Sequence, residues 1–323
     1  MIVLVIAVGV LWIVPSNEYV FLPDPPHNAD ELVQVPGEKT EPENGGIYMV
    51  DIVVRKASLL EWLLGKLHAP QLHEGASLVP GVEVNPAGVS EAQQRRQSLN
   101  EMSQSQLVAA AVALRYLGHK VDAKPDGAQV TLVYPNSPAD GKLQIGDVII
   151  EANGKKVATT GDLRTAMAPV KPGQEVTFVV RRSGGRQDVR LGTRADPQEP
   201  NRAVVGVIIE QSADIDLPVK VRINAGSIGG PSAGLAFALD IVDESGRDLD
   251  HGRKIVVTGA LDLDGKVEPI GGIQQKTIAA KDAHAALFLV PDENAAEAKR
   301  NAGGMKVVPV SSFREALSAL ATS

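Results

Sequence analysis

Cysteine is absent from this 323-residue chain, and aromatic residues make up only 3% of it. Without cysteine the chain has no disulfides, no thiol nucleophile and no zinc site built from thiolates. The scarcity of aromatic residues predicts cores of Val, Leu, Ile and Ala, for which a hydrophobic content of 44% is sufficient. The length allows two or three domains.

Basic residues are too few to favour nucleic acid as a partner. The net charge is −7 and the isoelectric point is about 5.5, whereas nucleic-acid binding needs a concentrated basic surface. The chain also lacks a Gly-x-x-x-x-Gly-Lys-Ser/Thr sequence, so it carries no recognisable nucleotide-driven motor. We expect no nucleic-acid partner, no metal and no cofactor, and we expect any catalysis to be independent of ATP.

Residues 1–14 form an almost unbroken apolar run that ends at Pro15. As a helix, this run is shorter than the roughly 20 residues that cross a bilayer. No Lys or Arg occurs before Lys39, and no small-residue cleavage site precedes Pro15. We expect residues 1–15 to be an uncleaved membrane anchor whose beginning is missing, with the rest of the chain outside the cytoplasm. A signal-like segment and a buried N-terminal core element are the alternatives.

Ser232 lies in the sequence GGPSAG, residues 229–234, at the predicted start of a helix over residues 233–244. The first N–H groups of a helix have no partner within it, and they carry the positive end of the helix dipole. A serine at this point can attack a carbonyl group whose developing oxyanion meets the backbone N–H groups of Gly230 and Ser232. An ordinary helix start, where Ser and Gly are common, is the alternative interpretation.

Lys276 is the candidate base for this serine. It lies on an apolar stripe of a helix predicted from Ile273 to about His284, whereas Lys281 on the same helix has more mixed neighbours. Burial disfavours the charged form of a lysine and so lowers its pKa, which allows the amine to accept the serine proton. A lysine whose ammonium group reaches solvent is the structural alternative.

The residues around Ser232 and Lys276 resemble the proteolytic domain of the Lon family of Ser-Lys peptidases. The resemblance rests on GPSAG at 230–234, TGALDLDGKVEPIGG at 258–272 and the later lysine. It implies a serine nucleophile at Ser232, a lysine base at Lys276 and a supporting hydroxyl at Thr258. The chain departs from the family pattern at Gly229 and Ala260, where acidic residues are usual.

A second resemblance covers about residues 117–193 and is to PDZ domains of the bacterial protease type. It rests on Ser-Pro-Ala at 137–139, Leu-x-x-Gly-Asp-x-Ile at 143–149 and Asn-Gly at 153–154. The resemblance implies a peptide that docks by strand addition in a groove between a strand and a short helix. The nearest match to the carboxylate-binding loop is Leu117, Gly118 and His119, although Gly118 is also a typical helix stop.

Together these features predict an α+β chain with four parts. Residues 1–15 are the anchor or signal-like segment, and residues 16–116 form an N-terminal extension that ends in an amphipathic helix. A PDZ-like, β-rich, peptide-binding domain at 117–195 and a Lon-like proteolytic domain at 201–323 follow, joined by a Pro-rich linker.

The predicted function is that of an ATP-independent serine endopeptidase, of the Lon-like Ser-Lys type, that acts on exported or unfolded polypeptides. The PDZ-like domain would recognise substrates or regulate the enzyme, and the Lon resemblance also implies a homo-oligomer. A non-catalytic PDZ scaffold with a decayed peptidase domain is one alternative. A Ser-His-Asp esterase is the other, because GPSAG also fits Gly-x-Ser-x-Gly, with His251 or His284 as the base.

Overall fold

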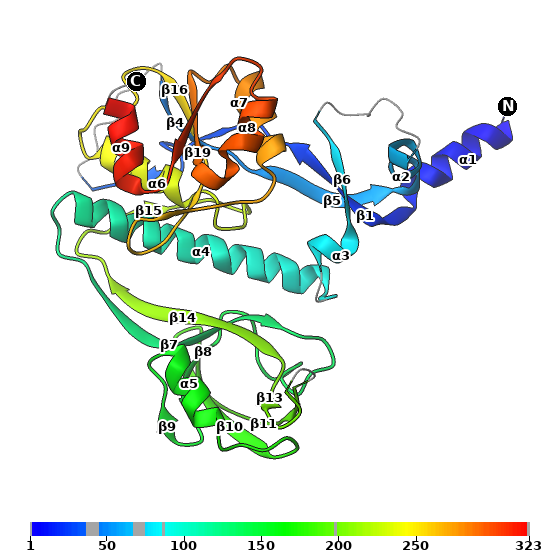
Figure 1. The fold of residues 1–323 in the computed structure, drawn as a ribbon, viewed down its shortest axis with the longest axis vertical. Helices are drawn as coiled ribbons and strands as arrows, with labels where there is room; N and C mark the ends of the chain where they lie inside the picture. The colour runs from blue at the N-terminus through cyan, green and yellow to red at the C-terminus, as the bar shows by residue number, and fades with distance from the viewer. Residues whose placement is uncertain (1, 37–44, 67–74, 86–87, 197–198, 322–323) are drawn as a thin grey trace. The chain divides into compact units, whose positions relative to one another are not determined.

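The computed structural model describes residues 2–36, 45–66, 75–85, 88–196 and 199–321. The chain divides into two compact units (Figure 1). The first unit is discontinuous along the sequence and combines Met1–Pro86, Met102–Lys120 and Pro218–Ser323. The second unit combines Ala87–Glu101 and Val121–Leu217.

A five-stranded sheet forms the centre of the first unit. Its order is β2 (His27–Asn28), β4 (Gly46–Met49), β16 (Lys254–Val257), β19 (Leu287–Pro291) and β20 (Lys306–Val310). The last four strands are parallel, and β2 is antiparallel to β4. Each of the four parallel strands contributes fully buried aliphatic or aromatic side chains such as Ile47, Ile255 and Phe288. The first unit therefore has a mixed α/β fold.

Helices join the parallel strands of this sheet, as parallel pairing requires. The chain passes from β16 through α7 (Ile273–Asp282) to β19, and from β19 through the 3₁₀ turn η1 (Asp292–Asn294) and α8 (Ala295–Asn301) to β20. The first unit also contains α6 (Gly234–Glu244) and the C-terminal α9 (Phe313–Ala321). The sequence predicted α6 and α7 to within about two residues, the usual uncertainty of helix bounds.

The sequence predicts an extended connector over residues 15–46 and a strand over residues 47–54, and the structure has strands in both segments. A three-stranded sheet has the order β5 (Ile52–Ser58), β1 (Pro15–Pro23) and β6 (Ser77–Pro80). A short ladder pairs β3 (Val33–Gln34) with β15 (Arg222–Ile223). The division of the chain into four consecutive parts stays a prediction, but this region belongs to the same compact unit as α6 and α7.

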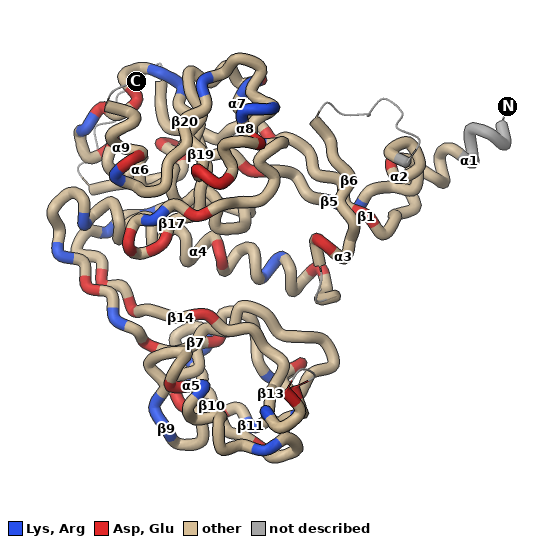
Figure 2. Tube along the Cα trace, viewed as in Figure 1, with Lys and Arg blue, Asp and Glu red and all other residues tan. Residues whose placement is uncertain are grey.

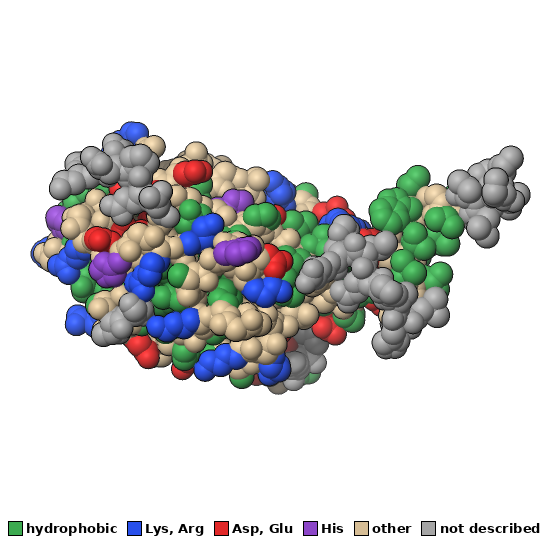
Figure 3. Space-filling view, turned by 90° about the horizontal axis from the view of Figure 1, so that it is seen from above, with side chains coloured by type: hydrophobic (Ala, Val, Ile, Leu, Met, Phe, Trp, Pro, Cys, Tyr) green, Lys and Arg blue, Asp and Glu red, His purple; other side chains and the backbone are tan. Residues whose placement is uncertain are grey.

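Apolar side chains are exposed around the N-terminal helices α1 (Ile2–Ile13) and α2 (Leu59–Lys66). Trp12 is 51% exposed, Ile13 80% and Trp62 36%. Figure 3 shows hydrophobic side chains gathered at one end of the molecule. Among the described residues no helix has the length and hydropathy needed to cross a membrane. The membrane anchor therefore stays a prediction.

The second unit is a twisted antiparallel sheet with one short helix, α5 (Thr160–Met167). Its strand order is β11 (Gly185–Gly192), β10 (Glu175–Arg182), β8 (Val148–Ala152), β7 (Asp122–Val133) and β14 (Val207–Asp216), and β9 (Lys155–Lys156) pairs with β8. A separate two-stranded ladder joins β12 (Arg194–Ala195) and β13 (Ala203–Val204). An aliphatic core that includes Val130, Ile149, Phe178 and Leu191 lies within this unit. The Asp162 carboxylate and the Thr159 hydroxyl form a capping box that fixes the start of α5.

The long helix α4 (Glu91–Tyr116) contributes residues to both units, and α3 (Gly81–Val84) precedes it. Its buried residues cluster between Met102 and Leu114, the segment with the apolar periodicity. The sequence predicted only this second half, because residues 91–100 are almost entirely polar. Figure 2 shows acidic and basic residues interspersed along both units.

Asp240 of α6 is fully buried, and neither of its carboxylate oxygens has a hydrogen-bond partner in the part of the chain that the structure describes. Burial, followed by the neighbouring carboxyl group of Asp30, raises the pKa of Asp240 well above its ordinary value. The protonated form therefore fits this position best. Because the folded state holds this proton more tightly than the unfolded state, stability from this group is lost as the pH rises.

We predict that Asp240→Asn raises the free energy of unfolding at pH 8 by about 1–3 kcal/mol, because the asparagine folds without taking up a proton or burying a charge. The asparagine stays neutral, so its advantage over the parent should shrink towards pH 4. Urea unfolding at several pH values measures this difference. Asp248→Asn is the control, since the Asp248 side chain is 61% exposed. A variant that is less stable than the parent at pH 8 would contradict the prediction.

Candidate active site

Ser232 and Lys276 meet in the first unit. Ser232 lies in a turn two residues before α6, and Lys276 lies in the first half of α7. Lys276 Nζ donates a hydrogen bond to Ser232 Oγ at 2.6 Å and another to Thr258 Oγ1 at 3.2 Å. The structure therefore brings together all three residues for which the sequence predicted a role in the chemistry. Their catalytic roles stay a prediction.

Lys276 is buried, with only 3% of its surface exposed. Burial disfavours the ammonium form and lowers the pKa of Lys276 from its ordinary 10.5 to about 8, while the nearby carboxylate of Asp51 acts in the opposite direction. A substantial fraction of the lysine is then an uncharged amine near neutral pH. Such an amine can accept the proton of Ser232 across the 2.6 Å contact.

The backbone at Ser232 is fixed by two hydrogen bonds from the strand end at β16. The Ser232 carbonyl accepts from the Gly259 N–H at 2.9 Å and from the Thr258 hydroxyl at 3.2 Å. Thr258 thus donates to the serine backbone while it accepts from Lys276. This single hydroxyl couples the position of the serine to that of the lysine.

Ser105 of α4 also supports the loop before α6, a role that the sequence did not suggest. Its hydroxyl donates to the Pro231 carbonyl at 3.0 Å. A Cβ atom at Gly234 would lie 2.7 Å from Ser105 Oγ, so only glycine allows this approach. The contact joins residues 126 positions apart, and no local sequence pattern indicates it.

The N–H groups of Gly230 and Ser232 are the predicted oxyanion donors. Gly230 has a φ of +87°, a left-handed conformation that favours glycine. Neither N–H donates to another described residue. Both donors are thus available to a ligand, in keeping with the predicted role.

His251 and His284 make no contact with Ser232 among the described residues. His251 forms an ion pair with Asp248 at 3.5 Å, and His284 contacts the Asp282 carbonyl at 2.8 Å. A loop of residues 224–233 separates β15 from α6, whereas a nucleophile elbow needs a strand that runs directly into the serine. The arrangement does not favour the Ser-His-Asp esterase.

Leu117, Gly118 and His119 close the C-terminal end of α4. Their backbone N–H groups donate to the carbonyls of Ala113, Arg115 and Leu114, respectively. Gly118 has a φ of +91°, as expected for a glycine that ends a helix. These N–H groups are therefore occupied in the structure. A peptide carboxylate would have to displace the helix cap to bind them.

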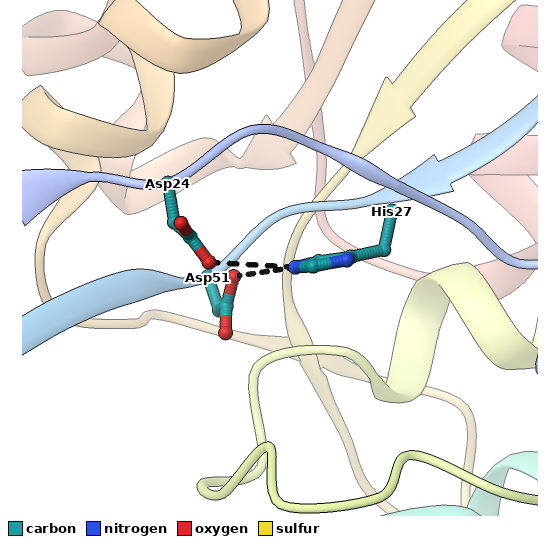
Figure 4. Close-up of side chains that lie close together, drawn as sticks. All are labelled: Asp24, His27 and Asp51. Atoms are coloured by element: carbon teal, nitrogen blue, oxygen red, sulfur yellow. Dashed lines mark ion pairs between the residues drawn. The ribbon is translucent and has the colours of Figure 1, made fainter.

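One group of side chains with metal-binding potential occurs in the described part of the chain. It consists of Asp24, His27 and Asp51, whose ligand atoms all lie within 4.8 Å of one another. Figure 4 shows the His27 ring pointing between the two carboxylates. No sequence motif indicated this cluster.

Comparison with known protein families identifies both parts of the chain. Residues 115–193 match the model of the PDZ domain, and residues 203–322 match the model of the Lon protease (S16) C-terminal proteolytic domain. The chain is thus similar to PDZ domains over the first range and to Lon-type proteolytic domains over the second. The resemblance predicted from the GPSAG and TGALDLDGKVEPIGG sequences is confirmed.

Individual relatives align with only part of the chain. A probable periplasmic serine endoprotease DegP-like from Ectopseudomonas mendocina is 38% identical over 77 residues, which are 24% of this chain and 16% of that protein. Lon protease 2 from Bacillus subtilis is 34% identical over 90 residues, 28% of this chain and 16% of that protein. The chain thus spans less than a fifth of the length of these relatives. Among solved structures, the PDZ domain of the SdrC-like protein from Listeria innocua covers 27% of this chain and 97% of its own, with 22% identity and a TM-score of 0.25.

We predict that the reactivity of Ser232 toward a fluorophosphonate rises about tenfold per pH unit below pH 8 and levels off above it. The reason is that the uncharged form of Lys276, whose pKa is about 8, must be present to accept the serine proton. Labelling rates measured from pH 6 to 10 give the midpoint. A midpoint near 10.5, the ordinary value of a lysine, would show that Lys276 is not desolvated as the structure describes.

Proposed function

We propose that this chain is an ATP-independent serine endopeptidase in which Ser232 is the nucleophile and Lys276 the general base. The observation that supports it most is the 2.6 Å contact between Ser232 Oγ and a buried lysine amine. Serine needs an adjacent base to become a nucleophile, and a desolvated lysine supplies one. The Lon-type domain match supports the same reaction class.

The proposed reaction has two half-reactions. Ser232 Oγ attacks the carbonyl carbon of a peptide bond while its proton passes to Lys276 Nζ, and the N–H groups of Gly230 and Ser232 stabilise the oxyanion. The intermediate collapses as Lys276 returns the proton to the leaving amine, which leaves an acyl group on Ser232. Water then hydrolyses this ester with Lys276 again as base. Thr258 keeps the lysine amine directed at Oγ in both steps.

Substrates of such an enzyme would be flexible or unfolded polypeptides, since the chain carries no nucleotide motif that would power unfolding. The relatives described as periplasmic support an extracytoplasmic location. The exposed apolar side chains on α1 and α2 support attachment of the N-terminal segment to a membrane. A homo-oligomer remains part of the proposal on the Lon resemblance alone.

The second unit would receive a substrate peptide at β14, which lies outside the matched PDZ residues 115–193, rather than at residues 117–119. β14 is the last strand of its sheet, and no described strand pairs with its outer edge. The Gln211 side chain on β14 accepts from the Thr160 N–H and donates to the Ala158 carbonyl, so it ties the start of α5 to this edge strand. An extended peptide that adds to β14 would find both a strand edge and a neighbouring helix.

The first test of the proposed function is cleavage of casein without ATP. We expect the parent to cleave casein and both Ser232→Ala and Lys276→Ala to lose activity by at least about a thousandfold while they stay folded. Lys281→Ala is the matched control, because this lysine lies on the same helix but does not contact Ser232, and it should cleave like the parent. Inactivity of the parent, or a Lys276→Ala variant as active as the parent, would favour the non-catalytic PDZ scaffold.

Two substitutions distinguish the candidate peptide sites. Gln211→Ala should weaken the binding of an unfolded polypeptide to the Ser232→Ala protein about tenfold, since α5 loses its tie to β14. Gly118→Ala should leave this affinity unchanged but lower the free energy of unfolding by about 1 kcal/mol, because alanine disfavours the left-handed cap. Fluorescence anisotropy and urea unfolding measure the two effects. The reverse pattern of affinities would place the peptide at residues 117–119.

A further inference from the structure

Three side chains converge where four strands of the first unit begin or end, namely those of Asp24, His27 and Asp51. Asp24 follows β1, His27 begins β2, and Asp51 lies between β4 and β5. His27 Nε2 lies 3.4 Å from Asp24 Oδ2 and 3.3 Å from Asp51 Oδ1. In Figure 4 the ring edge points into the gap between the two carboxylates. The three side chains therefore direct one nitrogen and two oxygens at a common point.

Strand pairing on both sides holds these side chains in place. β1 pairs with β5 up to Pro23 and Ile52, and β2 pairs with β4 from His27 and Met49. The intervening turn contains Pro25 and Pro26, whose rings restrict the backbone. The ligand atoms are thus arranged by the fold before any ion arrives, which lowers the entropic cost of binding.

The cluster leaves polar atoms without hydrogen bonds. His27 Nε2 and Asp51 Oδ1 are each buried and have no hydrogen-bond partner among the described residues, although they face each other. The two carboxylates also lie close to each other, since all three ligand atoms are within 4.8 Å of one another. A divalent cation would supply a partner for all three ligand atoms and offset the charge of both carboxylates.

The separations of the ligand atoms match a transition-metal site. Bonds of about 2.0–2.2 Å at tetrahedral angles place neighbouring ligand atoms about 3.3–3.6 Å apart, as in zinc sites with nitrogen and oxygen ligands. The distances from His27 Nε2 to Asp24 Oδ2 and Asp51 Oδ1 are 3.4 and 3.3 Å, and both lie within this range. An imidazole ligand favours zinc and similar ions over Mg²⁺ and Ca²⁺, which prefer oxygen alone.

We propose that Asp24, His27 and Asp51 form a binding site for one divalent transition-metal ion of the zinc type. Three protein ligands leave the fourth position to water. The ion would join the turn between β1 and β2 to the turn between β4 and β5. The next residue, Ile52, packs against the start of α7, where a Cβ atom at Gly272 would lie 2.6 Å from Ile52 Cδ1. The proposal does not depend on the peptidase reaction.

The test is a calorimetric titration of Zn²⁺ into the full chain carrying Ser232→Ala, after removal of metal with a chelator. We expect one ion per chain and a higher midpoint of thermal unfolding with Zn²⁺ than without it. Asp24→Asn, His27→Ala and Asp51→Asn should each weaken binding at least tenfold. Asp24→Asn and Asp51→Asn preserve the size of the side chain, and circular dichroism would verify that all variants are folded.

His251→Ala is the matched control. His251 also contacts a carboxylate, Asp248, but among the described residues no third ligand completes that pair. We expect this variant to bind Zn²⁺ like the parent. Three results would each overturn the proposal. The parent could fail to bind Zn²⁺, the Asp24, His27 and Asp51 variants could bind it as tightly as the parent, or the parent could bind Mg²⁺ as tightly as Zn²⁺.

Discussion

The candidate site depends on the burial of Lys276, whose positive charge is only partly compensated by a nearby carboxylate. Lys276 can serve as a base only because α7 places it out of water, and its burial is costly unless its amine finds hydrogen bonds. Ser232 and Thr258 provide those bonds. The strand β16 and the start of α6 must therefore keep their positions relative to α7. The Gly259 N–H and the Thr258 hydroxyl hold Ser232 in position, because both donate hydrogen bonds to its carbonyl.

Much of this site could be predicted from the sequence because its parts are local. The GPSAG sequence places a serine beside a helix start, and the apolar stripe around Lys276 indicates burial of the lysine. What joins them is a contact between residues 44 positions apart, which only the family resemblance suggested. The helices followed from periodicity alone, whereas residues 91–100 of α4 did not, since a polar sequence carries little apolar periodicity.

Features that depend on distant partners could not be predicted. β4 pairs in parallel with β16 across about two hundred residues, and β3 pairs with β15 over a similar distance. A two-residue or four-residue strand has no distinctive local pattern, so the Pro-rich N-terminal region suggested a connector instead. The cluster of Asp24, His27 and Asp51 escaped notice for the same reason. Asp24 and Asp51 come from turns and His27 from the first residue of β2, and they meet through the pairing of β1 with β5 and of β2 with β4 rather than through their spacing in the sequence.

The discontinuity of the first unit bears on how the PDZ domain could influence catalysis. The chain leaves the first unit after α4 and returns at Pro218. On the outgoing side, Ser105 of α4 holds the Pro231 carbonyl beside the serine. On the returning side, the chain runs from Pro218 through β15 into the loop that contains Ser232. Both connections between the matched PDZ residues and the first unit thus lead to the backbone around Ser232.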